Sequence, residues 1–150
     1  MIACVDSPVG RLTLTERDGA ICALEWRDEK AEADSDLMKQ AAGELAAYFA
    51  GQLTGFTLPL APRGSGFQQR FYRALCAIPY GETRTYGELA CELGVSAQAI
   101  GQACGANPIP ILIPCHRVLS STGLGGFSGA GGVETKVALL KLEGAASLLI

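Results

Sequence analysis

The hydrophobic pattern of the chain changes period partway along it, and this change favours a fold with two dissimilar parts. Residues 11–16 alternate between apolar and polar side chains, and residues 20–26 form a second strand-like run. Asp18-Gly19, which separates them, is a strong signal for a tight hairpin turn. From residue 65 onwards, apolar residues recur at helical spacing instead. The sequence therefore predicts an α+β protein with a small sheet followed by short helices.

The boundary between the two parts is predicted between residues 50 and 66. A helix over residues 36–49 is indicated by an apolar stripe that consists of Leu37, Ala41, Leu45, Tyr48 and Phe49. Gly51 ends this helix, and the Pro- and Gly-bearing stretch after it is typical of a linker. We expect an N-terminal domain over residues 1–62 and a mostly helical C-terminal domain over residues 63–150.

Two short helices in the second part form a helix-turn-helix candidate. Thr85 and Glu88 have capping-box spacing and open a helix that Gly94 closes. Ser96 caps the next helix, which runs to about residue 104. Apart from one isoleucine, this second helix carries almost no bulky side chain. It is either a tightly packed core helix or a thin helix that can enter a narrow groove.

A final amphipathic helix is predicted over residues 133–143. It directs four apolar residues toward a core: Val133, Val137, Leu139 and Leu140. Glu143 lies near its C-terminal end, where a carboxylate opposes the helix dipole. Glu143 is therefore either a solvated surface residue or a residue with a specific partner.

Composition limits the classes of function. No apolar run reaches the length of a membrane span, and the first residues do not form a signal peptide, so we expect a cytoplasmic protein with reduced cysteines. The six cysteines include no Cys-x-x-Cys pair, and there is one histidine, which argues against a zinc site. The net charge of −3 divides into −5 over residues 1–62 and +2 over residues 63–150, so only the second part has a balance suited to phosphates.

The most reactive pattern is Cys115-His116, which places one cysteine beside the only histidine. A free thiol is mostly protonated at neutral pH, so a nucleophilic cysteine needs a neighbouring base. On an extended backbone adjacent side chains point to opposite faces, so the two cooperate only if the chain turns there or a water bridges them. We favour the bridging water, with Glu143 as the group that orients the histidine.

Two neighbouring segments bear on this cysteine. Asn107 is the only asparagine and precedes a run containing three prolines. It is either a helix C-cap or a brace that holds the approach to Cys115. After the cysteine, residues 120–132 are dense in glycine, which suits either flexible filler or a rim that approaches a ligand closely.

These residues resemble a known family. Asn107-Pro-Ile-Pro-Ile-Leu-Ile-Pro-Cys-His-Arg-Val118 resembles the active-site signature of the O6-alkylguanine-DNA alkyltransferases, the methylated-DNA–protein-cysteine methyltransferases. The likeness extends through residues 78–82, 85–90 and 136–144, and covers residues 67–144 well. It implies a ribonuclease H-like N-terminal domain, and direct repair in which an alkylated guanine is flipped out of duplex DNA. The alkyl group then passes irreversibly to a cysteine in a single turnover.

The resemblance also implies roles for individual residues. Cys115 is the implied acceptor, His116 its base through a water, and Glu143 the orienting carboxylate. Asn107 braces the site, and Tyr86 displaces a phosphate and helps to protonate the departing guanine. The implied substrate pocket is lined by Val118, Phe127 and Ser128. No metal or organic cofactor is implied.

The helix after Ser96 is implied to lie in the minor groove of double-stranded DNA. The residues expected to bind DNA are Thr85, Tyr86, Ser96, Ala97, Gln98, Ala99, Gln102 and Arg117. The family usually has an arginine where this chain has Gln98, which predicts weaker duplex binding with a shallower salt dependence. We expect the protein to act as a monomer.

Two other hypotheses remain. The chain is alternatively a lesion-binding relative that accepts no alkyl group, although such relatives lack the cysteine present here. The third hypothesis is an unrelated hydrolase that uses Cys115, His116 and Glu143, but hydrolases of that kind normally take their histidine from far along the chain. Alkyl transfer to the protein, binding alone, and turnover of an ester or amide distinguish the three.

Overall fold

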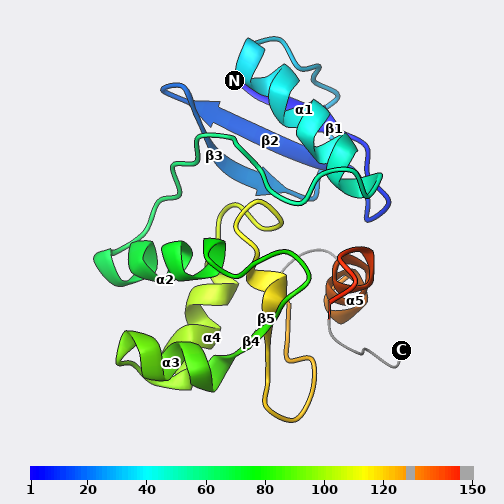
Figure 1. Cartoon of the computed structure of the whole chain (residues 1–150). Coiled ribbons are helices and arrows are strands. Elements are labelled where there is room, and N and C mark those ends of the chain that lie inside the picture. The colour runs from blue at the N-terminus through cyan, green and yellow to red at the C-terminus, as the bar shows by residue number, and fades with distance from the viewer. Residues whose placement is uncertain (128–130, 146–150) are drawn as a thin grey trace.

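The computed structural model describes residues 1–127 and 131–145. Its first part contains β1 (Ile2–Val5), β2 (Leu12–Arg17), β3 (Ala20–Glu25) and α1 (Asp36–Phe49). Its second part contains α2 (Gly66–Cys76), β4 (Arg84–Thr85), α3 (Tyr86–Leu93), α4 (Ala97–Gly105), the short 3₁₀ helix η1 (Cys115–Arg117), β5 (Val118–Leu119) and α5 (Val133–Leu142). This confirms the predicted α+β fold, with the sheet and α1 on one side of the molecule and most helices on the other (Figure 1).

The N-terminal sheet is antiparallel, in the order β1-β2-β3. The predicted hairpin joins β2 to β3, and Asp18 and Gly19 both have positive φ, of 53° and 76°. Such a turn matches the twist of the two strands. Leu14 lies opposite both Ala3 and Leu24 in the sheet, and all three are buried. The sequence analysis did not predict β1.

The predicted linker over residues 50–66 is not simply a spacer. The amide of Ile21 in β3 donates to the carbonyl of Pro59 at 2.9 Å, and the amide of Ala61 donates to the carbonyl of Ile21 at 2.8 Å. Leu60 thus forms an isolated parallel bridge to Ile21. These bonds satisfy backbone groups at the edge of the sheet that would otherwise be unpaired.

The predicted helix-turn-helix consists of α3 and α4. The side chain of Thr85 accepts from the amide of Glu88 at 3.0 Å, and that of Glu88 accepts from the amide of Thr85 at 2.8 Å, which completes the capping box. Gly94 ends α3 in the left-handed conformation, and Ser96 caps α4. These local signals place the first residue of α3, Tyr86, at a fixed position on the surface.

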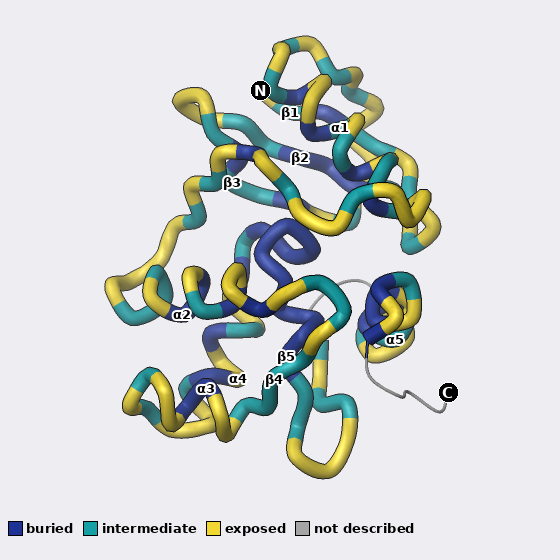
Figure 2. The backbone as a smooth tube through the Cα atoms, in the orientation of Figure 1, coloured by how far each residue is buried: buried dark blue, intermediate teal, exposed yellow. Residues whose placement is uncertain are grey.

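The segment 109–118 lies in the middle of the molecule, and every one of its residues is buried. Figure 2 shows this buried stretch between the sheet and the helices. The amide of Leu24 in β3 donates to the carbonyl of Pro108 at 2.9 Å, which ties the sheet to the start of the segment. Cys115 therefore lies at the junction of the two parts rather than at the tip of an exposed loop.

The last helix, α5, differs from its prediction in the residues that it buries. Val133 is exposed, whereas Thr135 and Lys136 are buried together with Leu139 and Leu140. The helix therefore turns Lys136 inward, where its ammonium group donates to the carbonyl of Val118. In the described parts of the chain, no helix is both long enough and apolar enough to span a membrane.

Candidate active site

Cys115 begins a helical turn, so the extended backbone assumed for the Cys115-His116 pair is wrong. The amide of Cys115 donates to the carbonyl of Ile113 at 2.8 Å, and the amide of Arg117 donates to that of Pro114 at 3.0 Å. The turn spans Cys115–Arg117 as η1. Adjacent side chains in such a turn do not point to opposite faces, so the geometric argument for a bridging water no longer applies.

Asn107 braces the segment that leads to this turn. Its amide nitrogen donates to the carbonyl of Ile113 at 2.9 Å, and its side-chain oxygen accepts from the amide of Ile109 at 3.0 Å. The C-cap residue of α4 is Ala106, so Asn107 is not that cap. Of the two readings from sequence, the structure places Asn107 in the bracing position.

Glu143 is buried at the end of α5 and is the centre of a polar network. One of its oxygens, Oε2, lies 2.7 Å from Nε2 of His116 and accepts from Nη2 of Arg117 at 3.0 Å. The other, Oε1, accepts from Nε of Arg117 at 2.8 Å. The hydroxyl of Tyr48, on α1, donates to Oε2 at 2.6 Å. The interpretation of Glu143 as a solvated residue is therefore wrong.

The network fixes which nitrogen of His116 carries a proton. Hydrogen bonds from His116, Arg117 and Tyr48 lower the pKa of Glu143 to about 2, although burial opposes this. An ionised carboxylate only accepts hydrogen bonds, so His116 must donate from Nε2. Burial lowers the pKa of His116, so the ring is neutral and its Nδ1 is a free base. Among the described residues this Nδ1 has no hydrogen-bond partner.

Cys115 is a thiol at rest rather than a thiolate. Burial raises its pKa, and a hydrogen bond from Asn107 and the charge of Lys136 offset only part of this effect. The free Nδ1 of His116 is not within hydrogen-bond distance of this thiol. A buried thiol close in sequence to a neutral imidazole is nevertheless suited to a reaction in which the proton leaves only when the sulfur attacks.

Arg117 was expected to bind DNA, and its position argues against this. It is only 7% exposed, pairs with Glu143, and donates from Nη1 to the carbonyl of Ile78 at 2.7 Å. Its guanidinium also lies 5.9 Å from the ring centre of Tyr80. With its donors engaged inside the protein, Arg117 is a structural partner of the carboxylate and not a phosphate ligand.

Lys136 is a site residue to which the sequence analysis gave no role. Its ammonium group donates to the carbonyl of Val118 at 2.6 Å and to that of Gly126 at 3.0 Å. It also lies 5.8 Å from the ring centre of Tyr86. Lys136 thus joins β5, the glycine-dense loop and α3. A lysine at a core-facing helical position was the available signal.

Tyr86 lies half-buried at the start of α3 and lines a surface cavity of about 500 Å³ between α3 and α4. The cavity is lined by Thr85, Tyr86, Gly87, Ala97, Gln98, Gly101, Ser120 and Ser121. Burial raises the pKa of Tyr86 to about 12, so its hydroxyl remains a proton donor at neutral pH. The cavity brings together four of the residues predicted to bind DNA.

The remaining predicted residues are distributed differently. Ser96 is exposed as the cap of α4, whereas Ala99 and Gln102 line a separate cavity of about 210 Å³ beside Phe67. Val118 is fully buried in β5. Phe127 packs edge-on against Trp26, with 6.1 Å between the ring centres. Ser128 lies outside the described residues.

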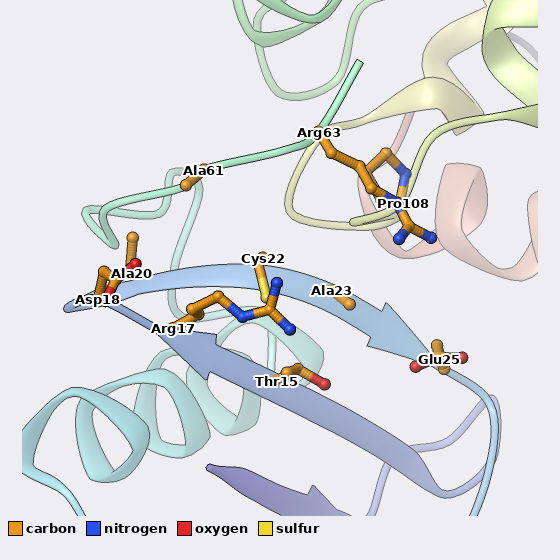
Figure 3. Close-up of a pocket in the computed structure, with 10 residues that line it drawn as sticks. All are labelled: Thr15, Arg17, Asp18, Ala20, Cys22, Ala23, Glu25, Ala61, Arg63 and Pro108. Carbon is orange, nitrogen blue, oxygen red and sulfur yellow. The ribbon is translucent and has the colours of Figure 1, made fainter.

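A further cavity lies against the N-terminal sheet. It has a volume of about 380 Å³ and is lined in part by Arg17, Cys22, Arg63 and Pro108. Figure 3 shows the side chains of Arg17 and Arg63 on either side of this space, between the sheet and the linker. None of the residues proposed from sequence for catalysis lines it.

Comparisons with known proteins agree with the geometry. A family model described as "6-O-methylguanine DNA methyltransferase, DNA binding domain" matches residues 66–145, and one described as the "ribonuclease-like domain" of the same family matches residues 2–62. A methylated-DNA–protein-cysteine methyltransferase from Mycolicibacterium paratuberculosis is 47% identical over 149 residues, covering 93% of this chain and 89% of the relative. One from Methanosarcina barkeri is 41% identical, covering 93% and 94%.

Solved structures agree with the overall fold as well. The crystal structure of Mycobacterium tuberculosis OGT in complex with DNA matches with a TM-score of 0.84 and 43% identity, covering 97% of this chain and 95% of that one. That of the M. tuberculosis O6-methylguanine methyltransferase matches with a TM-score of 0.83 and 42% identity, covering 98% and 96%.

Proposed function

Because this chain belongs to the 6-O-methylguanine DNA methyltransferase family, we propose that Cys115 is the cysteine that receives the alkyl group. The protein repairs alkylated DNA by transferring the alkyl group to a cysteine of its own. The observation that supports Cys115 is its thiol in a buried turn next to His116, a neutral base oriented by a buried carboxylate. The other five cysteines have no such setting next to a histidine, because the chain has only one.

The proposed reaction is a direct displacement at the alkyl carbon. The proton of the Cys115 thiol passes through a water to Nδ1 of His116 as the sulfur attacks, since among the described residues this Nδ1 has no partner within hydrogen-bond distance. A carbon–sulfur bond forms, the bond from carbon to O6 of guanine breaks, and its electron pair stays on the guanine. The hydroxyl of Tyr86 supplies a proton to the departing base. The product is a thioether, which explains why one molecule acts once.

The base must leave the helix to reach a sulfur that is buried. We propose that α4 enters the minor groove, where its small side chains fit, with the cavity between α3 and α4 against the DNA. The guanine is then flipped past Tyr86 to Cys115, beside Val118 and Phe127. Flipping costs a few kcal/mol of unstacking, which contacts within the protein offset. The residues proposed to contact DNA are those that line or flank this cavity: Thr85, Tyr86, Ser96, Ala97 and Gln98. The proposed reaction requires no metal or organic cofactor.

We further propose that residues 1–62 and 63–150 are the two domains of the protein and that it acts as a monomer in the cytoplasm. The ranges of the two family models support the division. All six cysteines are free, as in a reducing compartment. Every side chain in the proposed reaction belongs to one chain, which supports the monomer.

The test is the intact mass of the protein after incubation with a duplex that contains one O6-methylguanine. We expect a single stoichiometric gain of one methyl group, located by peptide mapping at Cys115 and absent from Cys115→Ala. Cys91→Ala, which changes an exposed cysteine, is the matched control and should retain the gain. Binding without any mass gain would instead support a lesion-binding protein, and a gain at another cysteine would refute the assignment of Cys115.

A further inference from the structure

The hydroxyl of Tyr48 connects the N-terminal part of the protein to the proposed catalytic network. Tyr48 lies near the end of α1, 95 residues before Glu143, and its hydroxyl donates to Oε2 of Glu143 at 2.6 Å. Oε2 is also the oxygen that faces His116. The other side chains bonded to the Glu143 carboxylate in the described part of the chain, His116 and Arg117, belong to the C-terminal part. Tyr48 is its partner from the first 62 residues.

Packing holds the ring of Tyr48 in place. Tyr48 is 1% exposed, and its ring centre lies 5.1 Å from that of Phe49, 5.2 Å from that of Phe56 and 6.3 Å from that of Tyr80. A buried aromatic ring with three aromatic neighbours has few other rotamers available. Its hydroxyl is therefore a fixed donor, and its raised pKa keeps it protonated.

The hydrogen bonds at Glu143 show what this donor does. Arg117 bonds to both carboxylate oxygens, and Tyr48 and His116 share Oε2. When a second donor bonds to the same oxygen, the oxygen has less negative charge to offer to the first donor. Tyr48 therefore weakens the pull of the carboxylate on a proton at His116 and favours the neutral ring.

We propose that Tyr48 is a positioning residue for alkyl transfer, acting on His116 through the Glu143 carboxylate. This proposal rests on the proposed function. Tyr48 does not touch the cysteine or the substrate; it orients the carboxylate and sets how basic the imidazole is. The N-terminal domain thereby contributes to the rate of the reaction.

His116 responds to every charged or titratable group packed around it. Besides burial, the groups that shift its pKa are Glu143, Arg117 and Lys136. Cys115 is its neighbour in η1, and Tyr48 of α1 reaches it only through Glu143. Replacing Tyr48 with Phe removes one donor and leaves the others in place. The carboxylate then holds the protonated imidazole more strongly, so the pKa of His116 rises and a larger fraction of the base is blocked at low pH.

The test is the rate of single-turnover methyl transfer between pH 5 and pH 8 in Tyr48→Phe. We expect the acidic limb of the profile to move up by about one pH unit, which makes transfer about tenfold slower on that limb. The rates converge with those of the wild type at the upper end, and the affinity for duplex DNA does not change. Tyr80→Phe is the matched control, because that hydroxyl belongs to the same aromatic cluster but donates to the carbonyl of Leu142.

A second measurement separates this role from a structural one. His116 is the only histidine, so its imidazole nitrogens are identified without ambiguity in ¹⁵N NMR spectra. We expect Nε2 to be protonated in the wild type and the imidazole pKa to rise in Tyr48→Phe but not in Tyr80→Phe. Incorporating 3-fluorotyrosine at position 48, which keeps the ring and makes the hydroxyl a stronger donor, should lower that pKa.

The outcomes are distinguishable. A rate loss that is equal at every pH, or an imidazole pKa that does not move in either variant, overturns the role of Tyr48. If Tyr48→Phe does not fold, the fluorotyrosine protein decides the question alone. If the wild type itself gains no methyl group at Cys115, the proposed function fails instead, whatever the titration of His116 shows.

Discussion

At the scale of single residues, the hydrogen-bond partners of Glu143 explain how a buried carboxylate is tolerated at this site. A carboxylate at the C-terminal end of a helix is unfavourable, and burying it adds a desolvation cost. Arg117, His116 and Tyr48 together satisfy both oxygens. Replacing the carboxylate with an amide leaves the buried guanidinium of Arg117 without a counter-charge. It also places the amide hydrogens against the donors that the carboxylate accepted from.

We therefore expect Glu143→Gln to lower the free energy of unfolding by about 3 kcal/mol at pH 7, as when one partner of a buried ion pair is removed. Urea denaturation measures this change. Glu134→Gln is the matched control, since Glu134 is exposed in the first turn of the same helix and should change stability by less than about 0.5 kcal/mol. Equal effects of the two substitutions would contradict the importance of the buried network.

The same network predicts how stability depends on pH. The pKa of His116 is lowered from its ordinary value of 6.5, and that of Glu143 is lowered from 4.5 to about 2. The unfolded chain therefore binds more protons than the folded one as the pH falls through these values, so acid favours unfolding. We expect the free energy of unfolding to fall below about pH 6.5 and again between about pH 4.5 and pH 2. In Glu143→Gln the second decrease should be much smaller than in the wild type, and an unchanged decrease would assign it to other carboxyl groups.

Residue chemistry was predictable only where it depends on sequence neighbours. The pairing of Cys115 with a lone histidine is visible in the sequence, whereas the burial of Arg117 is not. An arginine two residues after a cysteine can face either solvent or a carboxylate 26 residues away, and only the folded chain decides between them. For Lys136 only the core-facing helical position was a signal, because its partners are backbone carbonyls, which the sequence does not mark.

At the scale of elements, local signals were reliable. The sequence predicted the ends of α3 and α4 from three features: the capping box at Thr85, the glycine at Gly94 and the cap at Ser96. All three occur in the structure. Such motifs need only neighbouring residues to form. The turn at η1 was missed because its proline-rich lead-in favours extended backbone. In the structure, bonds from Cys115 to Ile113 and from Arg117 to Pro114 close the turn.

The surface of α4 is where this protein is expected to differ from relatives with an arginine. Gln98 is exposed at the cavity between α3 and α4 and brings no charge to DNA. We expect Gln98→Arg to bind duplex DNA more tightly and to steepen the plot of log affinity against log salt by about 0.9, the effect of one added phosphate contact. Fluorescence anisotropy at several salt concentrations measures both quantities.

The control for this substitution has the same change of charge at a distant place. Gln52 is exposed just after α1, so Gln52→Arg tests the effect of net charge alone. It should change the salt slope by much less than Gln98→Arg. If Gln98→Arg leaves affinity and slope as they are, α4 does not approach the phosphates in the way that we propose.

At the scale of the whole molecule, the N-terminal part contacts the active-site region at separate places. Tyr48 reaches the carboxylate, Leu24 bonds to the start of the buried segment, and Trp26 packs against Phe127 on the glycine-dense loop. None of these contacts was predictable, because each joins residues that are far apart in sequence. The sequence indicated the two parts, but their docking depends on shapes that exist only after both have folded.

The contact between Trp26 and Phe127 tests how strongly the two parts are coupled. An edge-on aromatic pair contributes about 0.5–1.5 kcal/mol beyond the area that it buries. We expect a double-mutant cycle of Trp26→Ala and Phe127→Ala, measured by urea denaturation, to give a coupling energy in that range. Trp26→Ala alone costs more, because it also loses the bond from its indole nitrogen to the carbonyl of Val9 at 3.1 Å.

The control cycle pairs Trp26→Ala with Phe67→Ala, whose ring stacks on Phe71 in α2 instead. Distant, independent substitutions add to within about 0.5 kcal/mol, so this second cycle should give little coupling. Since Lys136 bonds to the carbonyl of Gly126, next to Phe127, loosening this contact should also increase hydrogen exchange at the amides of residues 123–127. Additive stabilities together with unchanged exchange would mean that the loop is held by the C-terminal part alone. The N-terminal part would then act on the site through Tyr48 and through the bond from Leu24 to Pro108.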